Sequence, residues 1–213
     1  MNTQIAIIGA GNMGGAIARG LSKGTLIQSK NIRVSDVSQA NLDAVTAFNP
    51  EIVVSNSNRE IVKNADIVIL AIPFKHLAGT LETLHGFEGK TVISPVNPME
   101  KRDFFITVPP EDGSAALMIK RLLPSDAKIC TAFNTIAANK WKALDEELAY
   151  SVPVCGDDAS AKHEVMGIVN KVSKLHAFDA GPLAASSLVE SLTPLLLNIA
   201  RYNKMHDVGI QFH

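Results

Sequence analysis

Three glycines in a fixed spacing open the part of the sequence best suited to chemistry. Gly9, Gly11 and Gly14 form a Gly-x-Gly-x-x-Gly pattern directly after an apolar run and at the start of a helix-like segment. The first glycine of such a pattern permits a tight turn, the second lets the main chain approach a diphosphate, and the third allows close packing of helix on strand. The helix end then offers unpaired amides to the phosphates. The pattern predicts a dinucleotide site whose contacts are Gly9, Ala10, Gly11, Asn12, Met13 and Gly14.

An acidic residue closes the second apolar run, where a dinucleotide enzyme holds the adenosine ribose. Asp36 follows Ser35, and we expect both to contact the cofactor. A carboxylate there repels the extra phosphate of NADP by about 4 kcal/mol at about 4 Å and an effective dielectric of about 20. The next residues, Val37-Ser38-Gln39, supply no arginine, so charge alone favours NAD(H). The alternative is that Asp36 only caps the helix that begins near Ser38.

Later strand-like runs end in prolines and polar residues. Ligands of doubly wound sheets lie beyond the carboxyl ends of the strands, and prolines there hold a loop in one shape. Each proline could also simply terminate its strand, and His76 could be an exposed residue at a helix start. We expect the nicotinamide side of the site to be lined by Ala71, Ile72, Pro73, His76, Ser94, Pro95, Asn134, Thr135 and Ile136.

Apolar runs alternate with helix-period segments along the chain, which is typical of an α/β protein with crossover helices. The fold class that this pattern predicts is a Rossmann-type doubly wound, mostly parallel sheet with a small C-terminal helical extension. We place a dinucleotide-binding domain at residues 1–150 and the extension at 151–213. Strands are expected at 5–8, 32–35, 52–55, 67–72, 91–94, 129–133, 152–155 and 176–178, and helices at 12–23, 38–48, 57–64, 75–85, 113–123, 138–149 and 158–174.

Residues 183–205 form one long helical pattern with a broad apolar stripe, interrupted by Pro194. Proline should kink the helix. A surface helix of a small domain seldom needs so wide an apolar face, so we interpret it as closing the cofactor cleft and pairing with a second subunit. An ordinary core helix is the alternative.

The composition excludes several classes of partner. The 213 residues carry 20 Lys and Arg against 21 Asp and Glu, which leaves no basic field for nucleic acid. No uncharged run approaches the length of about 20 residues that a membrane helix needs. The two cysteines, Cys130 and Cys155, have no metal-ligand spacing and read as reduced core thiols in a cytoplasm. We expect a small-molecule partner, no metal, no membrane and a cytoplasmic homodimer.

No catalytic acid, base or nucleophile can be assigned, because no Ser/His/Asp order, metal cluster or carboxylate pair is present in the sequence pattern. Hydride transfer needs none of these groups, since the cofactor carries the chemistry and the protein positions two rings in a dry pocket. The sequence therefore indicates an oxidoreductase.

Several motifs together resemble the NADP-dependent reductases of the deazaflavin coenzyme F420, over nearly the whole chain. The motifs are residues 152–158, 179–183 and 188–194, Leu197-Asn198-Ile199, Arg201, residues 72–76 and Ser94-Pro95. The resemblance implies hydride exchange between a nicotinamide and a flavin-like or deazaflavin acceptor, in a homo-oligomer. It makes Asn134 and Ser186 candidate contacts of the acceptor ring. The family's second strand usually ends in a Ser-Arg pair that grips the NADP phosphate, where this chain has Asp36-Val37.

Two further resemblances concern shorter segments. The glycine loop at residues 7–18 is similar to pyrroline-5-carboxylate reductase, and Ala132-Phe133-Asn134-Thr135-Ile136 is similar to the reductase domain of the STEAP metalloreductases. The alternatives to a deazaflavin-linked reductase are thus an imine reductase of the pyrroline-5-carboxylate type and a non-catalytic dinucleotide-binding redox sensor.

Overall fold

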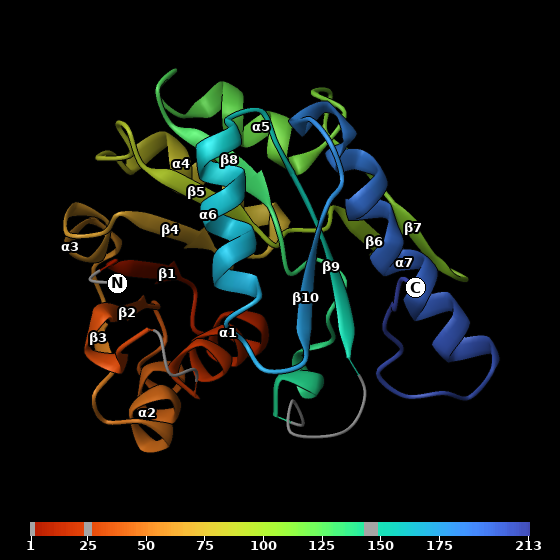
Figure 1. Ribbon diagram of the computed structural model, residues 1–213, viewed down its shortest axis with the longest axis horizontal. Coiled ribbons are helices and arrows are strands. Elements are labelled where there is room, and N and C mark those ends of the chain that lie inside the picture. Colours follow the sequence, from red (N-terminus) through yellow and green to blue (C-terminus); the bar gives the residue numbers. More distant parts are fainter. Residues whose placement is uncertain (1–2, 24–26, 143–148) are drawn as a thin grey trace.

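An eight-stranded sheet forms the centre of the molecule (Figure 1). The computed structural model describes residues 3–23, 27–142 and 149–213. The strands lie in the order β10-β9-β8-β5-β4-β1-β2-β3. Their bounds are β1 Ile5–Ile8, β2 Ile32–Ser35, β3 Val53–Ser55, β4 Ile67–Leu70, β5 Thr91–Ser94, β8 Lys128–Thr131, β9 Tyr150–Gly156 and β10 Leu175–Asp179.

The sheet is mostly parallel, which confirms the predicted fold class. Strands β3, β2, β1, β4, β5 and β8 pair in parallel, with Ile5 of β1 opposite Ile32 of β2 and Ile67 of β4. Strand β9 runs antiparallel to β8, and β10 is parallel to β9. The chain crosses from one side of β1 to the other between β3 and β4, so the switch point where such sheets bind ligands lies between β1 and β4.

Helices cover both faces of this sheet (Figure 1). Apolar residues of α1, α2 and α6 belong to the core on one face, and those of α3, α4 and α5 to the core on the other. The helix bounds are α1 Asn12–Lys23, α2 Gln39–Phe48, α3 Asn58–Lys63, α4 Phe74–Thr83, α5 Ala115–Leu122, α6 Ala159–Val169 and α7 Ser186–Tyr202, and the short 3-10 helices are η1 Ser29–Asn31, η2 Ala138–Lys142 and η3 Leu183–Ala185.

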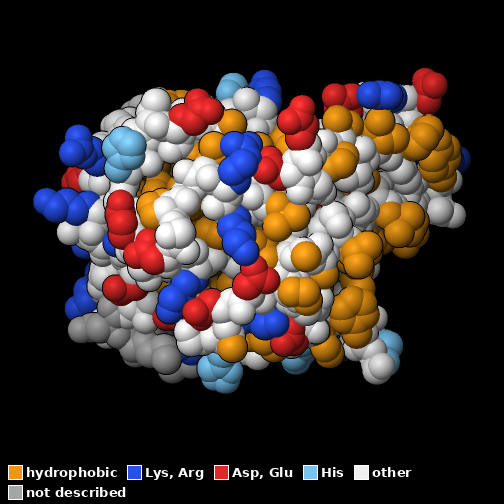
Figure 2. All heavy atoms as spheres, turned by 90° about the horizontal axis from the view of Figure 1, so that it is seen from above, with side chains coloured by type: hydrophobic (Ala, Val, Ile, Leu, Met, Phe, Trp, Pro, Cys, Tyr) orange, Lys and Arg blue, Asp and Glu red, His pale blue; other side chains and the backbone are white. Residues whose placement is uncertain are grey.

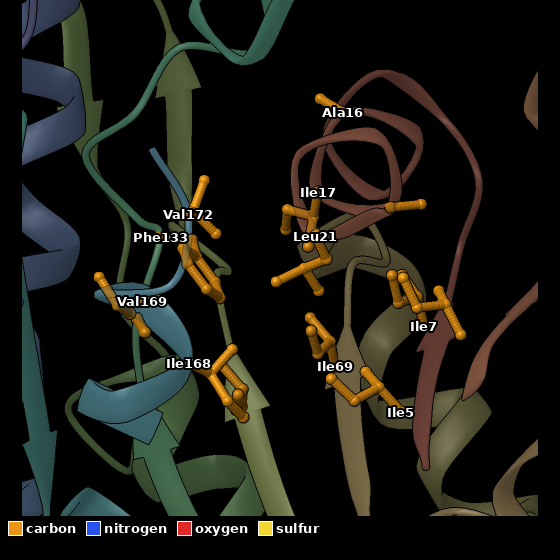
Figure 3. Close-up of a cluster of buried hydrophobic side chains, with 14 of the residues drawn as sticks. Ile5, Ile7, Ala16, Ile17, Leu21, Ile69, Phe133, Ile168, Val169 and Val172 are labelled. Carbon is orange, nitrogen blue, oxygen red and sulfur yellow. The ribbon is translucent and has the colours of Figure 1, made fainter. Parts of the chain in front are cut away.

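Strand β1 shows why the central runs contain so many branched apolar residues. Its four residues are all buried: Ile5 and Ile7 pack into one core, and Ala6 and Ile8 into the other. In Figure 3, Ile17 and Leu21 of α1 lie over Ile5, Ile7 and Ile69. A strand buried on both faces needs an unbroken apolar run, and this run is the signal that identifies it in the sequence.

Several predicted boundaries differ from the structure. Strand β8 ends at Thr131 rather than residue 133, because Phe133 takes a left-handed conformation with φ 68° and turns the chain. Strand β4 ends at Leu70, and α6 ends at Val169 rather than 174. The helix predicted at 138–149 is the 3-10 helix η2 in its first part, and residues 143–148 lie outside the described residues.

A two-stranded hairpin was not predicted. Strands β6 Met99–Lys101 and β7 Phe105–Thr107 pair antiparallel and form a separate small sheet beside α7. The domain division expected after residue 150 falls at the start of β9, whose pairing with β8 extends the main sheet. The division itself stays a prediction.

Helix α7 is joined to the hairpin by polar side chains. Asn198 accepts a hydrogen bond from the Phe105 NH (2.8 Å) and donates one to the Phe105 carbonyl (2.7 Å), as a neighbouring strand would. Arg201 donates to the Asp103 carbonyl at 2.6 Å. By length and composition alone, the stretch Leu183–Tyr202 could cross a membrane, with a mean hydropathy of 1.4 and 28% of it buried. The absence of a membrane partner stays a prediction.

Candidate functional site

A pocket of about 1050 Å³ opens at the carboxyl ends of β1, β2, β4 and β5, around the switch point of the sheet. Ten residues predicted for the site line it, and they come from the glycine turn and from the ends of β2, β4 and β5. The predicted residues that line it are Gly9, Gly11, Asn12, Met13, Asp36, Ala71, Ile72, Pro73, His76 and Pro95.

The glycine turn shows three different reasons for its glycines. Gly9 has φ 96°, and an added Cβ would lie 2.4 Å from the Ala71 carbonyl oxygen. A Cβ on Gly14 would lie 1.8 Å from the Gly9 carbonyl oxygen, so the helix packs directly on the turn. Gly11 has no atom within 4 Å of an added Cβ, so packing within the chain does not require glycine there. The open space beside Gly11 is where the second glycine of this pattern lets a diphosphate approach the main chain.

The amides of the glycine turn divide into two groups: Gly9 NH and Ala10 NH donate to Ser35 and Asp36, whereas Gly11, Asn12 and Met13 line the pocket. The first helical hydrogen bond of α1 runs from the Gly15 NH to the Gly11 carbonyl at 2.9 Å. The amides ahead of it, in the first turn, have no preceding helical carbonyl to bond. With the positive end of the helix dipole at the same place, the turn can hold a diphosphate.

Asp36 reaches from the end of β2 back to the glycine turn. Its Oδ2 accepts a hydrogen bond from the Ala10 NH at 2.6 Å, and its Oδ1 accepts one from the Ser38 NH at 2.8 Å. The N-cap of α2 is Ser38 and not Asp36, so the alternative that Asp36 only caps this helix is wrong. The carboxylate is half-buried and lines the pocket, as a ribose contact must.

The opposite wall is mostly apolar. Ile72, Pro73, Pro95, Val96 and Met99 line it, with Pro73 as the N-cap of α4. His76 lies in the first turn of α4, is exposed and faces the pocket, so it can meet a cofactor as predicted. A flat apolar wall suits ring systems that must stack.

Other predicted contacts lie behind this surface instead of on it. Ser35, Ser94, Thr135 and Ile136 are buried, as are Ala10 and Gly14, and none of these six lines the pocket. Ser35 donates from Oγ to Asn58 Oδ1 at 2.6 Å, and Thr135 donates to the Ser151 carbonyl at 3.4 Å. Ser35 thus holds the wall residue Asn58, and direct contact of these six residues with a cofactor stays a prediction.

Asn134 is buried at the end of β8 and joins three segments. Its Nδ2 donates to the Val96 carbonyl (3.0 Å) and to Asn97 Oδ1 (3.2 Å), and its own carbonyl accepts from Asn97 Nδ2 (3.1 Å) and Thr193 Oγ1 (2.5 Å). The amide nitrogen must face Val96, because the reverse orientation would place two oxygens together. Asn134 Oδ1 is buried and has no donor among the described residues. Asn134 therefore holds the Val96–Asn97 part of the wall, and its contact with an acceptor ring stays a prediction.

Ser186 lies at the start of α7, fully buried and away from the pocket lining. Its Oγ is 2.7 Å from Ser114 Oγ, at the N-cap of α5. One turn further, Glu190 accepts hydrogen bonds from the Ala115 NH (2.8 Å) and the Ala116 NH (3.0 Å). Burial raises the pKa of Glu190 to about 7, against the lowering effect of these two amides. The structure thus gives Ser186 a role in attaching α7 to α5.

The cysteines are free and buried. Burial raises the pKa of Cys130 to about 12 and also raises that of Cys155. A thiol with so high a pKa is a poor nucleophile, which agrees with the interpretation of both residues as core thiols. Among the described residues no three His, Cys, Asp or Glu side chains are grouped as metal ligands would be, and the absence of a metal stays a prediction.

Some wall residues were missed by sequence reasoning. One face of α4 lines the pocket with His76, Gly79, Thr80 and Thr83, of which only His76 was predicted. Their three-to-four spacing after a strand end is a signal that could have identified them. Met99 belongs to the unpredicted hairpin, and Asn41 and Asn58 lie at the starts of α2 and α3.

Comparisons with known proteins agree with this geometry. Residues 4–98 match the family model described as NADP oxidoreductase, coenzyme F420-dependent. The F420-dependent NADP reductase of Methanocaldococcus jannaschii is 29% identical over 164 residues, which cover 75% of this chain and 73% of that protein. A solved structure from Arthrobacter sp. FB24, described as a candidate F420-dependent NADP reductase, covers 99% of both chains with a TM-score of 0.80 and 20% identity, which shows a shared fold.

The two shorter resemblances are also confirmed. A pyrroline-5-carboxylate reductase from Methanosarcina acetivorans is 39% identical over 83 residues, or 39% of this chain and 30% of that protein. Rat metalloreductase STEAP3 is 26% identical over 138 residues, which cover 65% of this chain and 27% of that protein. Only a part of each of these two proteins corresponds to this chain.

Proposed function

We propose that this chain, whose residues 4–98 match the family model described as NADP oxidoreductase, coenzyme F420-dependent, transfers a hydride between a nicotinamide dinucleotide and coenzyme F420. The observation that carries the proposal is the single pocket with a glycine turn at one end and an apolar wall at the other. The curated relatives are named as F420-dependent NADP reductases, so NADP and F420 are the pair to test first.

The residues of the pocket fit a dinucleotide. The space beside Gly11 is open, and an added Cβ there would fill it without touching the chain. The amides of the first turn of α1 would hold the diphosphate, and Asp36 would hold the adenosine ribose. When bound, the nicotinamide ring supplies the hydride chemistry.

The apolar wall of the pocket would position the nicotinamide ring and shield it from water. Ile72 and Pro73 on one side and Pro95, Val96 and Met99 on the other would pack against the bound rings and leave little room for water between them. Asn134 fixes the Val96 carbonyl and the Asn97 side chain, so the wall keeps one shape. The hydride itself passes from ring to ring without a protein acid or base, and the proton that accompanies reduction of the deazaflavin would come from solvent.

The test is direct spectroscopy on the purified protein. Reduced F420 with NADP or NAD, and oxidised F420 with NADPH or NADH, should exchange hydride, seen as the change in F420 and nicotinamide absorbance. FMN, free flavin and pyrroline-5-carboxylate serve as competing acceptors. Oxidation of the nicotinamide by pyrroline-5-carboxylate alone would favour the imine reductase, and tight binding without oxidation by any acceptor would favour the redox sensor.

We also propose that two copies of the chain pair through α7. Its outer face leaves Leu188 72%, Leu195 53% and Tyr202 66% exposed. Figure 2 shows hydrophobic side chains gathered on the side of the molecule where α7 and the hairpin lie. Apolar patches of this kind mark interaction surfaces.

Light scattering coupled to gel filtration should give the mass of a dimer for the wild type. The double variant Leu188→Glu and Leu195→Glu should give a monomer, whereas Val37→Glu, at a residue 96% exposed elsewhere, should leave the dimer intact. A monomeric wild type would contradict the pairing. A cytoplasmic location is likewise our proposal, supported by the two free thiols and tested by cell fractionation.

A further inference from the structure

The carboxylate at the end of β2 is the charged group of the pocket that would meet the adenosine ribose. Resting on the proposed function, we infer that Asp36 determines the choice of dinucleotide and that the protein binds NADH in preference to NADPH. The family description and the curated relatives name NADP, so this chain would differ from them at one position of the site.

Asp36 is fixed in place from two directions. The Ala10 NH, in the glycine turn, holds Oδ2 at 2.6 Å, and the Ser38 NH, at the start of α2, holds Oδ1 at 2.8 Å. Asn56 Nδ2 also donates to the Asp36 carbonyl at 3.4 Å. To rotate the carboxylate out of the pocket, a ligand would have to leave two main-chain amides without their acceptors. The negative charge therefore stays at the rim when a dinucleotide binds.

The residues that line the pocket beside Asp36 carry no positive charge. The residues that line this end of the pocket with it are Val37, Asn41 and Asn58, all of them uncharged. Among the described pocket-lining residues Lys75 is the one Lys or Arg, and it lies on α4, which follows β4. Strand β1 separates β4 from β2, so the Lys75 main chain is two strand spacings, about 10 Å, from the end of β2.

The chemistry of the two cofactors differs at this point alone. The ribose 2′-hydroxyl of NADH can donate a hydrogen bond to a carboxylate that already accepts one bond at each oxygen. The 2′-phosphate of NADPH has only acceptors and a negative charge there, so it meets Asp36 with repulsion and no hydrogen bond. The site fits NAD and does not fit the additional phosphate.

The test is calorimetric binding of NADH and NADPH at low ionic strength. The wild type should bind NADH at least about tenfold more tightly, and added salt should narrow the difference because it screens the repulsion. In the double variant Asp36→Ser with Val37→Arg the preference should reverse. Val37 is 96% exposed, so an arginine side chain at that position displaces no core residue. The variant Asp43→Asn removes one exposed acid from α2, outside the pocket lining, and should leave the wild-type ratio unchanged.

Equal affinity for both cofactors, or tighter NADPH binding, in the wild type would overturn the inference whatever the variants do. The same result with F420 reduction intact would leave the proposed function in place. Loss of the NADH preference in Asp43→Asn would also overturn the inference, because general charge and not Asp36 would then set it. No binding of either dinucleotide would overturn both proposals together.

Discussion

Adding a methyl group at either of two glycines in the same turn should have opposite effects: at one position it should lower the stability of the fold, and at the other it should weaken dinucleotide binding. The variants are Gly11→Ala and Gly14→Ala. At Gly14 the new Cβ would lie 1.8 Å from the Gly9 carbonyl oxygen and 3.0 Å from Ala71 Cβ. Gly9 belongs to the glycine turn, and Ala71 follows the end of β4. At Gly11 it would meet nothing within 4 Å, and Gly11 has no left-handed φ that alanine would strain.

The expected magnitudes follow from these distances. A carbon at 1.8 Å from an oxygen must move by more than about 1 Å, and overpacking of this kind costs about 1–3 kcal/mol even after the better helix propensity of alanine. For a chain of this length that is a fall in Tm of about 3–10 °C. Gly11→Ala should instead leave the free energy of unfolding unchanged or raise it by up to about 1 kcal/mol, because alanine restricts the unfolded chain. Its Tm should therefore be equal to or slightly above that of the wild type.

The affinity for NADH should be affected mainly by the substitution at Gly11, which leaves the stability of the fold unchanged. Gly11→Ala fills the space that a diphosphate needs, so its affinity for NADH should fall at least about tenfold, which corresponds to about 1.4 kcal/mol. Differential scanning fluorimetry gives Tm, and calorimetry gives the affinity of both proteins. If Gly11→Ala bound NADH like its parent, the diphosphate would not lie at this turn. If Gly14→Ala melted like its parent, the packing argument would fail.

Three further substitutions test other parts of the structure. Burial raises the pKa of Glu190 to about 7, above its ordinary value near 4.5. The folded protein binds this proton more tightly than the unfolded chain does, so about 3 kcal/mol of stability should be lost as the pH rises from about 4.5 to about 7. Urea unfolding of Glu190→Gln should lack this pH dependence. Asn134→Ala leaves the Val96 carbonyl without its donor, so it should lower the unfolding free energy by about 1–3 kcal/mol and slow hydride transfer more than it weakens NADH binding; equal losses in both would contradict its positioning role. In Gly20→Ala the new Cβ would lie 2.2 Å from Trp141 Cε3, and the fluorescence of this single tryptophan should report a fall in stability of about 1–3 kcal/mol.

The first half of the site could be predicted because its signals are local. The glycine spacing, the apolar run before it and the acid after the second run all lie within β1, α1 and β2, and α1 begins and ends where the sequence predicts. The bond from the Ala10 NH to Asp36 crosses only 26 positions of the chain. The elements of this strand–helix–strand unit contact one another and are close in the sequence, so the local sequence pattern is enough to predict how they are arranged.

The second half could not be predicted because its elements depend on distant partners. Strand β6 is three exposed residues, Met99–Lys101, with no apolar alternation to mark it. Its partner β7 is held by Asn198, 93 positions along the chain. The antiparallel direction of β9 is likewise set by its pairing with β8, and no turn residue in the sequence reports it. Phe133 takes a left-handed conformation and turns Asn134 toward the Val96 loop. Because Phe133 is not a glycine, its residue type does not predict this conformation.

Three side chains along α7 hold three other segments of the chain in place. Glu190 holds the start of α5, Thr193 holds the Asn134 carbonyl, and Asn198 holds the hairpin that brings Met99 to the pocket. A glycine turn can serve any dinucleotide, whereas Thr193 and Asn198 support the apolar end of the pocket through Asn134 and the hairpin, and we propose that the acceptor binds there. We therefore expect substitutions along the inner face of α7 to change the rate of hydride transfer to the acceptor while the affinity for the dinucleotide stays unchanged.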